Sequence, residues 1–338
     1  MSKRKAPAKE ETPAVERGWR LFHGDNQAHP VDDFPPAPPW RTFDGVPPDT
    51  PRRIEPAPQR APFFVDAPEI DLVNAAIYLR RPLLITGKPG IGKSSLVYAI
   101  AHELQLGKPL IWPINTRSTV DDGLYRYDAI GRLQEQPRQR QEGVAAAPPD
   151  EGDPFELLGK YVKLGPLGTA FLPAHKPRVL LIDEIDKSDI DLPNDLLNIF
   201  EDGSFEIPVL SRVTTRWCDV PVRAHDGTDR VVIHEGFVKV KEFPIVVMTS
   251  NGERDFPQPF LRRCIRMNME TPNEEKLRNI VLGHLQTSGS GDLISEFHRR
   301  AQQADLATDQ LLNAVFLTTR PNVQVTEALK ESILKELK

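Results

Sequence analysis

The sequence predicts an α/β fold in which a parallel sheet is flanked by helices and is followed by a small all-helical domain. Three observations lead to this prediction. Short apolar runs alternate with amphipathic helical patterns, a glycine-rich loop joins the first run to a helix, and strand patterns stop near residue 270. Continuous apolar runs are typical of strands buried on both faces, as in parallel sheets covered by helices.

The first 60 residues form a proline-rich segment. Of the 33 prolines in the 338-residue chain, 14 lie within the first 68 residues, and this density excludes regular helix or central strand there. We therefore expect residues 1–60 to be largely extended or disordered. The alternative is that aromatic side chains anchor the segment to a neighbouring surface: Trp19, Phe22, Phe34, Trp40 and Phe43.

Residues 61–270 are expected to form the α/β domain. A helix is predicted from Asp66 to about Arg81, because Asp66 can cap it, Pro68 lies in its first turn and apolar residues recur at helical spacing. Buried strands are predicted at five places, of which the last has the weakest pattern: residues 82–86, 109–114, 178–182, 244–250 and 264–269.

Three further segments differ from these strands in composition or in polarity pattern. Residues 134–154 are polar and rich in Pro, Gly and Ala, which predicts an exposed, flexible insertion. Residues 213–243 alternate in polarity, which predicts a hairpin. Residues 271–338 are expected to form the small helical domain, since amphipathic patterns occur at residues 274–285, 292–304 and 322–337.

The loop after the first predicted strand has the composition of a polyphosphate-binding site. GKPGIGKS matches the spacing G-x-x-x-x-G-K-S and lies between a strand and a helix, which argues against a merely structural glycine-rich turn. In this motif backbone N–H groups surround the phosphates, the lysine contacts them and the hydroxyl binds Mg²⁺. The sequence therefore predicts a nucleoside triphosphate site at Gly87, Lys88, Pro89, Gly90, Ile91, Gly92, Lys93, Ser94 and Ser95, with Ser94 as a Mg²⁺ ligand.

Acidic residues end the third predicted strand, VLLIDEID. Asp183 follows four apolar residues, which places it at the carboxyl edge of the sheet, where doubly wound folds bind ligands. We expect Asp183 to hold Mg²⁺ through water and Glu184 to polarise the attacking water. An isolated acidic run would be a solvated loop, but the P-loop argues for a site. Asn251 ends the next strand, where it positions the water, senses the γ-phosphate or is simply a turn residue.

Together these motifs resemble those of AAA+ ATPases, and more specifically those of the MoxR branch. GKPGIGKS resembles the Walker A motif of the family, LLIDEID resembles Walker B, and TSN at residues 249–251 resembles sensor 1. Residues 165–173 and 183–208 are similar to MoxR-type sequences beyond the nucleotide motifs. The resemblance extends from about Val65 to the C-terminus.

The resemblance implies further site residues. Arg263 is the first choice, and Arg262 the second, for an arginine finger that reaches the nucleotide of the next subunit; without the resemblance, the pair would be interpreted as surface charge. Arg320 is the candidate for sensor 2, the arginine of the helical domain that contacts the γ-phosphate. Its surrounding sequence departs from the commoner Ser-Pro-Arg form. Residues 115–133 look like the insert that lines the pore in this branch.

The function implied by the resemblance is hydrolysis of ATP to ADP and phosphate with Mg²⁺, in a hexameric ring that remodels a protein client. A partner with a von Willebrand A domain is implied as well. One alternative, less favoured, is a nucleic-acid motor that uses the hairpin residues Arg223, Arg230, Lys239 and Lys241. Another is an ATP-dependent scaffold with little turnover, against which Glu184 argues.

Composition sets the remaining expectations. The formal net charge of −5 gives no global basic field, which argues against strong nonspecific binding to nucleic acid. Cys218 and Cys264 have no metal or redox spacing, which fits a reducing, cytoplasmic location. The sequence shows no secretion signal and no apolar stretch near the roughly 20 residues of a membrane span, so we expect no membrane association.

Overall fold

The structure, a computed structural model, describes residues 18–134, 158–212, 219–227, 230–287, 291–302, 306–320 and 326–334. Except for its first residue, the insertion predicted at residues 134–154 lies outside the described residues, and Cys218 does too. Among the described residues, no helix combines the length and the apolar composition needed to cross a bilayer.

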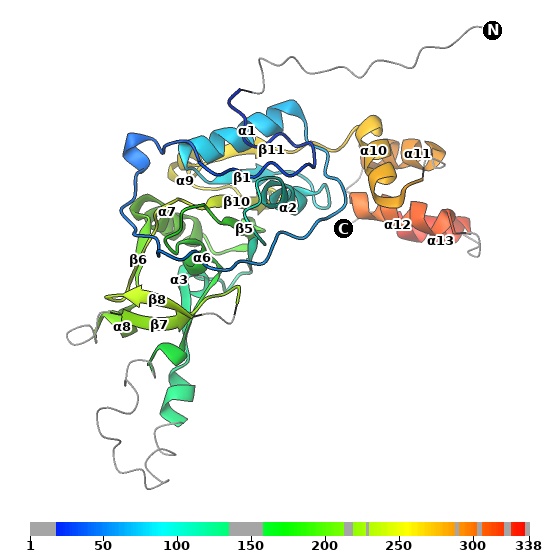
Figure 1. Cartoon of the computed structure of the whole chain (residues 1–338). Helices are drawn as coiled ribbons and strands as arrows, with labels where there is room; N and C mark the ends of the chain where they lie inside the picture. Colours follow the sequence, from blue (N-terminus) through cyan, green and yellow to red (C-terminus); the bar gives the residue numbers. More distant parts are fainter. Residues whose placement is uncertain are drawn as a thin grey trace.

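A five-stranded parallel sheet forms the centre of the fold (Figure 1). The strand order is β11-β1-β10-β5-β2, and every pairing is parallel, so the carboxyl ends of all strands lie at one edge. The strands coincide with the five predicted apolar runs, which confirms the predicted fold class: β1 Leu83–Thr86, β2 Leu110–Pro113, β5 Val179–Asp183, β10 Ile245–Ser250 and β11 Ile265–Asn268.

Helices cover both faces of this sheet, because alternate strand residues point to opposite sides. Leu83 and Ile85 of β1 pack with helices α1 (Ala67–Leu79) and α2 (Lys93–Glu103). Leu84 instead belongs to the core on the other face, which contains α6 (Pro166–Ala170), α7 (Leu192–Asp202) and α9 (Gln258–Arg263). The predicted first helix is capped as expected, by a capping box between Asp66 and Glu69.

A second sheet projects from the α/β core (Figure 1). Its six strands follow the order β3-β4-β7-β8-β9-β6, and β7 and β8 form the antiparallel hairpin expected within residues 213–243. The strands are β3 Tyr125–Tyr127, β4 Val162–Leu164, β6 Ser204–Glu206, β7 Asp219–Arg223, β8 Arg230–His234 and β9 Phe237–Lys239, with the short helices α3 (Val120–Leu124) and α8 (Pro208–Ser211) beside them.

The C-terminal helices have a core of their own beside the α/β domain (Figure 1). They are α10 (Glu274–Leu285), α11 (Gly291–Ala301), α12 (Thr308–Thr318) and α13 (Glu327–Ile333). Three of them lie within predicted helical patterns. No clear helical pattern predicts α12, because the buried Leu311, Ala314 and Val315 are interleaved with the apolar Leu312 and Phe316.

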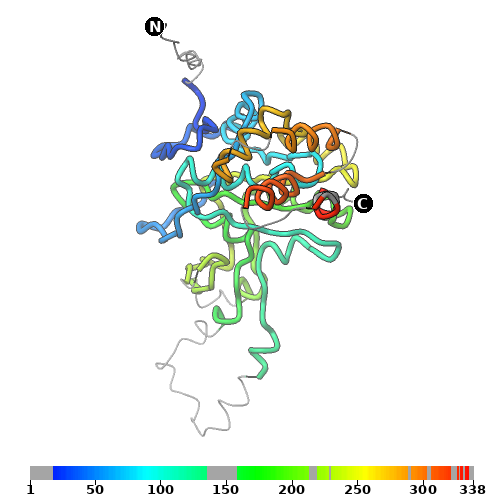
Figure 2. The backbone as a smooth tube through the Cα atoms, turned by 90° about the vertical axis from the view of Figure 1, so that its right-hand side faces the viewer, coloured from blue at the N-terminus to red at the C-terminus, as the bar shows by residue number. Residues whose placement is uncertain are grey.

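The proline-rich segment has little regular structure, but it has fixed contacts. Residues 18–64, which we call the strap, follow the outside of the α/β domain before entering α1 (Figures 1 and 2). Phe22 is fully buried, and its N–H and carbonyl both bond to the side chain of Asn74. Trp40, by contrast, is 73% exposed. Phe22, one of the aromatic residues of this segment, therefore anchors the strap to α1.

Two arginine sites fasten the strap further along. Arg41, 5% exposed, donates to the carbonyls of Arg80 and Phe200 at 2.8 and 3.0 Å. Arg52 and the buried Arg178 each form a 2.6 Å ion pair with Asp226. Burial acts to raise the pKa of Asp226, but the two arginines outweigh it, and the pKa lies below its ordinary value. Removing Asp226 would leave the buried Arg178 without its ion-pair partner.

Candidate active site

The P-loop, residues 87–94, connects the carboxyl end of β1 to the first turn of α2. Gly90 and Gly92 have φ angles of 73° and 99°, in the left-handed region that favours glycine. A Cβ at Gly90 would also lie 2.1 Å from the Cβ of Ala307, so the close approach of the helical domain requires glycine there. The loop thus leads into a helix N-terminus whose free N–H groups suit an anion.

Lys93 is the central cation of this loop. Its amine donates to the carbonyls of Gly87 and Lys88 at 2.7 and 2.8 Å, and to Oδ1 of Asn251 at 2.8 Å. Burial lowers the pKa of Lys93, and the carboxylates of Asp186, Asp183 and Glu184 act in the opposite direction. The structure therefore brings Lys93, which lies in the loop after β1, into contact with Asn251, which follows β10. The sequence predicted both as site residues.

A hydroxyl and a carboxylate meet beside Lys93. Ser94 Oγ donates to Oδ1 of Asp183 at 2.9 Å, and Thr249 Oγ1 donates to the same oxygen at 2.6 Å. Thr249 also accepts the backbone N–H of Glu184 at 2.9 Å. Oxygen ligands of this kind suit Mg²⁺, which prefers a few protein oxygens together with water and phosphate. Ser94 and Asp183 therefore fit the predicted metal position.

Sequence reasoning gave Thr249 no role of its own. The sequence held a signal, because Thr249 lies near the end of a predicted strand of the same parallel sheet as Asp183. In the structure Met248 pairs with Ile182, which places Thr249 beside Asp183. The threonine fixes Asp183 and Glu184 at once, and thus orients the end of β5.

Glu184 directly precedes the short helix η3 (Ile185–Lys187) and has a left-handed conformation, with φ 59° and ψ 50°. A non-glycine residue in this region costs about 1–2 kcal/mol, and such residues cluster at functional sites. Its carboxylate is 42% exposed and pairs with Lys187 Nζ at 2.8 Å. The side chain is thus accessible to solvent at the sheet edge, where an attacking water would enter.

Asp186 supports the neighbouring strand end. Its Oδ2 accepts the backbone N–H of Asn251 at 2.8 Å and that of Glu253 at 3.2 Å. These bonds hold the residue that contacts Lys93, so Asp186 positions Asn251.

A cavity of about 680 Å³ adjoins the P-loop. The P-loop, α2, the strap and the C-terminal helices all contribute to its wall, and this size and mixed lining suit a nucleotide base and ribose. Arg60 of the strap lies over the ring of Tyr98, 3.2 Å from its centroid. Representative lining residues are Asn26, Phe63, Gly92, Tyr98, Ile280 and Thr308. The sequence pattern predicted the phosphate half of this site but not the strap's share.

Arg263 lies away from this site. It ends α9, just before β11, and the first residue of that strand, Ile265, pairs with Leu83 at the start of β1. Arg263 is therefore near the amino edge of the sheet, whereas the P-loop follows the carboxyl edge. Its Nε donates to Glu201 at 3.0 Å, and its side chain is 44% exposed. Arg262 is also exposed, and its carbonyl accepts a bond from Arg81.

The structure does not bring Arg320 to the cavity. Arg320 follows the C-terminal end of α12, with its guanidinium 4.3 Å from the ring centroid of Phe316. Thr308, at the other end of the same helix, lines the cavity and donates its N–H to Gly90. An 11-residue helix is about 16 Å long, so the two ends are well separated.

A family of known proteins matches part of the chain. The AAA domain family (dynein-related subfamily) matches residues 82–215, from the start of β1 past α8. Among solved structures, the chain is similar to NtrX from Brucella abortus in complex with ATP, with 14% identity and a TM-score of 0.36. The match covers 77% of this chain and 53% of the other, so the chain spans about half the length of that protein. No curated protein matches.

The matched region contains the loop around Lys93, the carboxylate of Asp183 and Glu184 beside it. The family match, the parallel sheet and the convergence of these groups at its carboxyl edge agree with one another. The chain therefore has a P-loop α/β fold, and its residues 82–215 match the AAA domain family.

Proposed function

We propose that the protein is a MoxR-type AAA+ ATPase that hydrolyses Mg·ATP in a hexameric ring and uses the energy to remodel a protein client. The observation that carries this proposal is the separation of Arg263 from the P-loop of its own chain. A nucleotide site of this class needs a cation that stabilises charge on the transferred phosphoryl group. A neighbouring subunit can supply it.

The residues at the carboxyl edge divide the remaining work. Lys93 would contact the β- and γ-phosphates, and Ser94 and Asp183 would hold Mg²⁺, the latter through water. Glu184 orients the attacking water and accepts its proton, after its carboxylate leaves Lys187. Asn251, which already contacts Lys93, responds to the γ-phosphate. When bound, Mg²⁺ neutralises charge on the phosphates.

Arg263 is our proposed finger because it is exposed, yet held in a defined direction. Strand β1 has four residues, so its two ends are separated by about 10 Å. Arg263 lies near the start of β1 and the P-loop follows its end, so about the length of this strand separates them within one chain. The ion pair with Glu201 fixes the guanidinium at the surface, where a second subunit can approach it. Arg262 remains the second candidate.

Mixing two inactive variants tests the shared site. Arg263→Ala is expected to bind ATP normally but to hydrolyse it at least 100-fold more slowly, since arginine fingers contribute about 10³–10⁵ in rate. Glu184→Gln lacks the water-orienting carboxylate. In rings formed at random from equal amounts of the two variants, one interface in four combines an intact Glu184 with an intact Arg263, so about a quarter of wild-type turnover should return if sites act independently.

The measurement is steady-state phosphate release at several mixing ratios, with each variant alone as the baseline. Arg266→Ala, an exposed arginine on β11, serves as the charge-matched control and should retain turnover. A mixture no more active than its two components would contradict the shared site, and active Arg263→Ala alone would exclude Arg263 as the finger.

The client is proposed from the family resemblance, which implies a protein with a von Willebrand A domain. The experiment that tests it is capture of partners from the native source with Glu184→Gln loaded with ATP, compared with Lys93→Ala as the nucleotide-free control. A von Willebrand A domain protein recovered only with the ATP-bound form would support the proposal. Recovery of nucleic-acid enzymes instead would support the alternative below.

One observation favours a nucleic-acid motor as the second candidate. Arg223 of β7 lies directly opposite Arg230 of β8, and both side chains are exposed. Like charges facing each other across strands destabilise a hairpin, and a bound polyanion would relieve the repulsion. Lys239 is exposed on the adjoining β9.

This alternative predicts that DNA or RNA stimulates ATP turnover several-fold, with a steep loss of stimulation as salt increases. The double variant Arg223→Ala/Arg230→Ala should lose the stimulation but keep basal turnover. Wild-type turnover that nucleic acid leaves unchanged would exclude the motor and leave the protein-remodelling function.

A further inference from the structure

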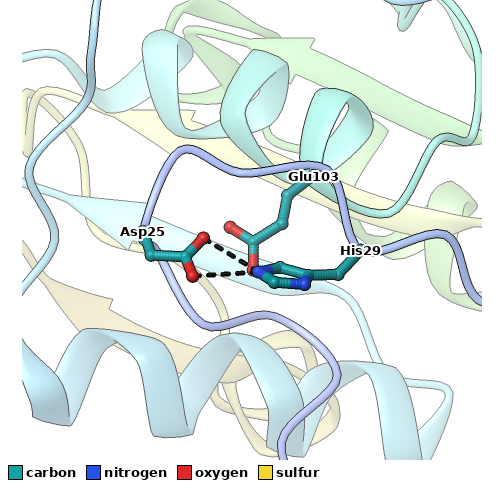
Figure 3. A group of neighbouring side chains, drawn as sticks. All are labelled: Asp25, His29 and Glu103. Atoms are coloured by element: carbon teal, nitrogen blue, oxygen red, sulfur yellow. Dashed lines mark hydrogen bonds and ion pairs between the residues drawn. The ribbon is translucent and has the colours of Figure 1, made fainter.

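A second group of converging side chains lies away from the phosphate site, where the strap meets the end of α2. Asp25 and His29 come from one loop of the strap, and Glu103 is the last residue of α2 (Figure 3). Their ligand atoms all lie within 4.8 Å of one another. His29 Nε2 lies 3.1 and 2.9 Å from the two carboxylate oxygens of Asp25.

The charge of this group is poorly compensated. Glu103 is 1% exposed, and within the described part of the chain no lysine or arginine forms an ion pair with it. Its two oxygens accept the backbone N–H groups of His23 and Gly24. A buried carboxylate beside a second carboxylate is costly without a cation.

We propose that Asp25, His29 and Glu103 bind a first-row divalent transition-metal ion, with Zn²⁺ as the leading candidate, and that this ion fastens the strap to α2. One imidazole nitrogen and two carboxylates are a ligand set that suits Zn²⁺, whereas Mg²⁺ prefers oxygen ligands alone. The ion takes the place of the proton that His29 Nε2 and Asp25 share, and water completes the coordination.

The surrounding bonds already orient these ligands. The N–H groups of His23 and Gly24 hold the Glu103 carboxylate, and the N–H of Gln27 donates to Asp25 Oδ1 at 2.9 Å. The N–H of His29 donates to the backbone carbonyl of Glu103 at 2.6 Å, which ties the loop to the helix. Such outer bonds typically change metal affinity 10–100-fold.

The proposed metal site is linked to the nucleotide cavity through Asn26. Asn26 follows Asp25 and lines the cavity, and its side chain exchanges two hydrogen bonds with the backbone of Phe63, at 3.0 and 2.8 Å. Phe63 lines the cavity too. A metal ion that fixes residues 23–29 on α2 therefore also fixes the strap's part of the cavity wall.

The test is titration of the untagged, metal-free full chain with Co²⁺ at pH 8, followed by visible absorption, and with Zn²⁺ in competition. We expect one Co²⁺ per chain, displaced by Zn²⁺ but not by millimolar Mg²⁺. His29→Ala and Asp25→Asn should each weaken binding at least about 10-fold. Both side chains are partly exposed, so these variants are expected to fold. The matched control is Asp33→Asn, an exposed acid on the same segment, which should bind like wild type.

Two further readouts separate this site from the ATPase. Lys93→Ala should bind Co²⁺ as wild type does, and Zn²⁺ should raise the melting temperature and slow proteolysis of the strap in wild type but not in His29→Ala. Absence of stoichiometric Co²⁺ binding, or equal binding by wild type and His29→Ala, would overturn the proposal and leave the ATPase assignment untouched.

Discussion

Lys93→Ala is expected to lower the affinity for ATP about 100-fold or more and to remove measurable turnover. The lysine amine is buried at the end of β1 and is held by the carbonyls of Gly87 and Lys88. It is thus already oriented toward the space where the loop surrounds phosphate. A charge-assisted hydrogen bond contributes about 1.5–3 kcal/mol, and the lysine of this motif makes such bonds to two phosphates.

The affinity is best measured by equilibrium binding of a fluorescent ATP analogue, with competition by unlabelled ATP. Lys108→Ala removes the same charge from the surface just beyond α2, where Lys108 pairs with Glu55, and should bind as wild type does. Thermal unfolding without nucleotide should give similar melting temperatures for both variants. Wild-type affinity in folded Lys93→Ala would mean that residues 87–94 do not bind the nucleotide.

The central strands of the parallel sheet, β1, β10 and β5, could be predicted because they are buried along nearly their whole length and therefore appear in the sequence as continuous apolar runs. The edge strands β2 and β11 are partly exposed, and β11 had the weakest pattern. The second sheet has short strands with mixed exposure, such as β3 (Tyr125–Tyr127), and its sequence signal is correspondingly weak. For α12 the apolar residues nearly surround the helix, so the helical period is obscured. Local pattern thus succeeds where burial is uniform along an element.

The phosphate half of the site could be predicted from local sequence, whereas the cavity for the base could not. Its phosphate half lies in continuous segments after β1, β5 and β10, so short motifs identified Lys93, Asp183 and Asn251, which the structure brings together. The cavity for the base involves the strap, whose proline content predicts irregular structure but not where it docks. Arg60 meets Tyr98 through a long-range contact that no local spacing encodes.

Arg320 was predicted from a short motif, but the structure does not place it at the cavity. Its assignment depended on the resemblance of residues 318–329 to a lid helix, part of which, residues 321–325, lies outside the described residues. In the structure the N-terminal turn of α12, rather than Arg320, adjoins the P-loop. Which end of a helix meets a ligand depends on how the helices pack, and this is not encoded in a short motif.

Glu184→Gln is expected to reduce turnover about 100-fold or more, because a positioned general base contributes about 10²–10⁴ in rate. The affinity for ATP should change less than about two-fold, since the phosphate contacts of Lys93 are intact. The change is nearly isosteric, and the backbone N–H of Glu184 would keep its bond to Thr249. Slow hydrolysis with normal binding should therefore trap the ATP-bound assembly.

The comparison that decides the function is between Glu184→Gln and Asp189→Asn, which makes the same acid-to-amide change on the exposed loop five residues later. Asp189→Asn should keep wild-type turnover in a phosphate-release assay, and single-turnover measurements should place the defect of Glu184→Gln in the chemical step. If both variants hydrolyse ATP at the wild-type rate, Glu184 is not the base, and the strained conformation at the end of β5 needs another explanation. If wild type itself barely turns over, ATP acts as an assembly signal, and the left-handed Glu184 holds Lys187 instead of a water.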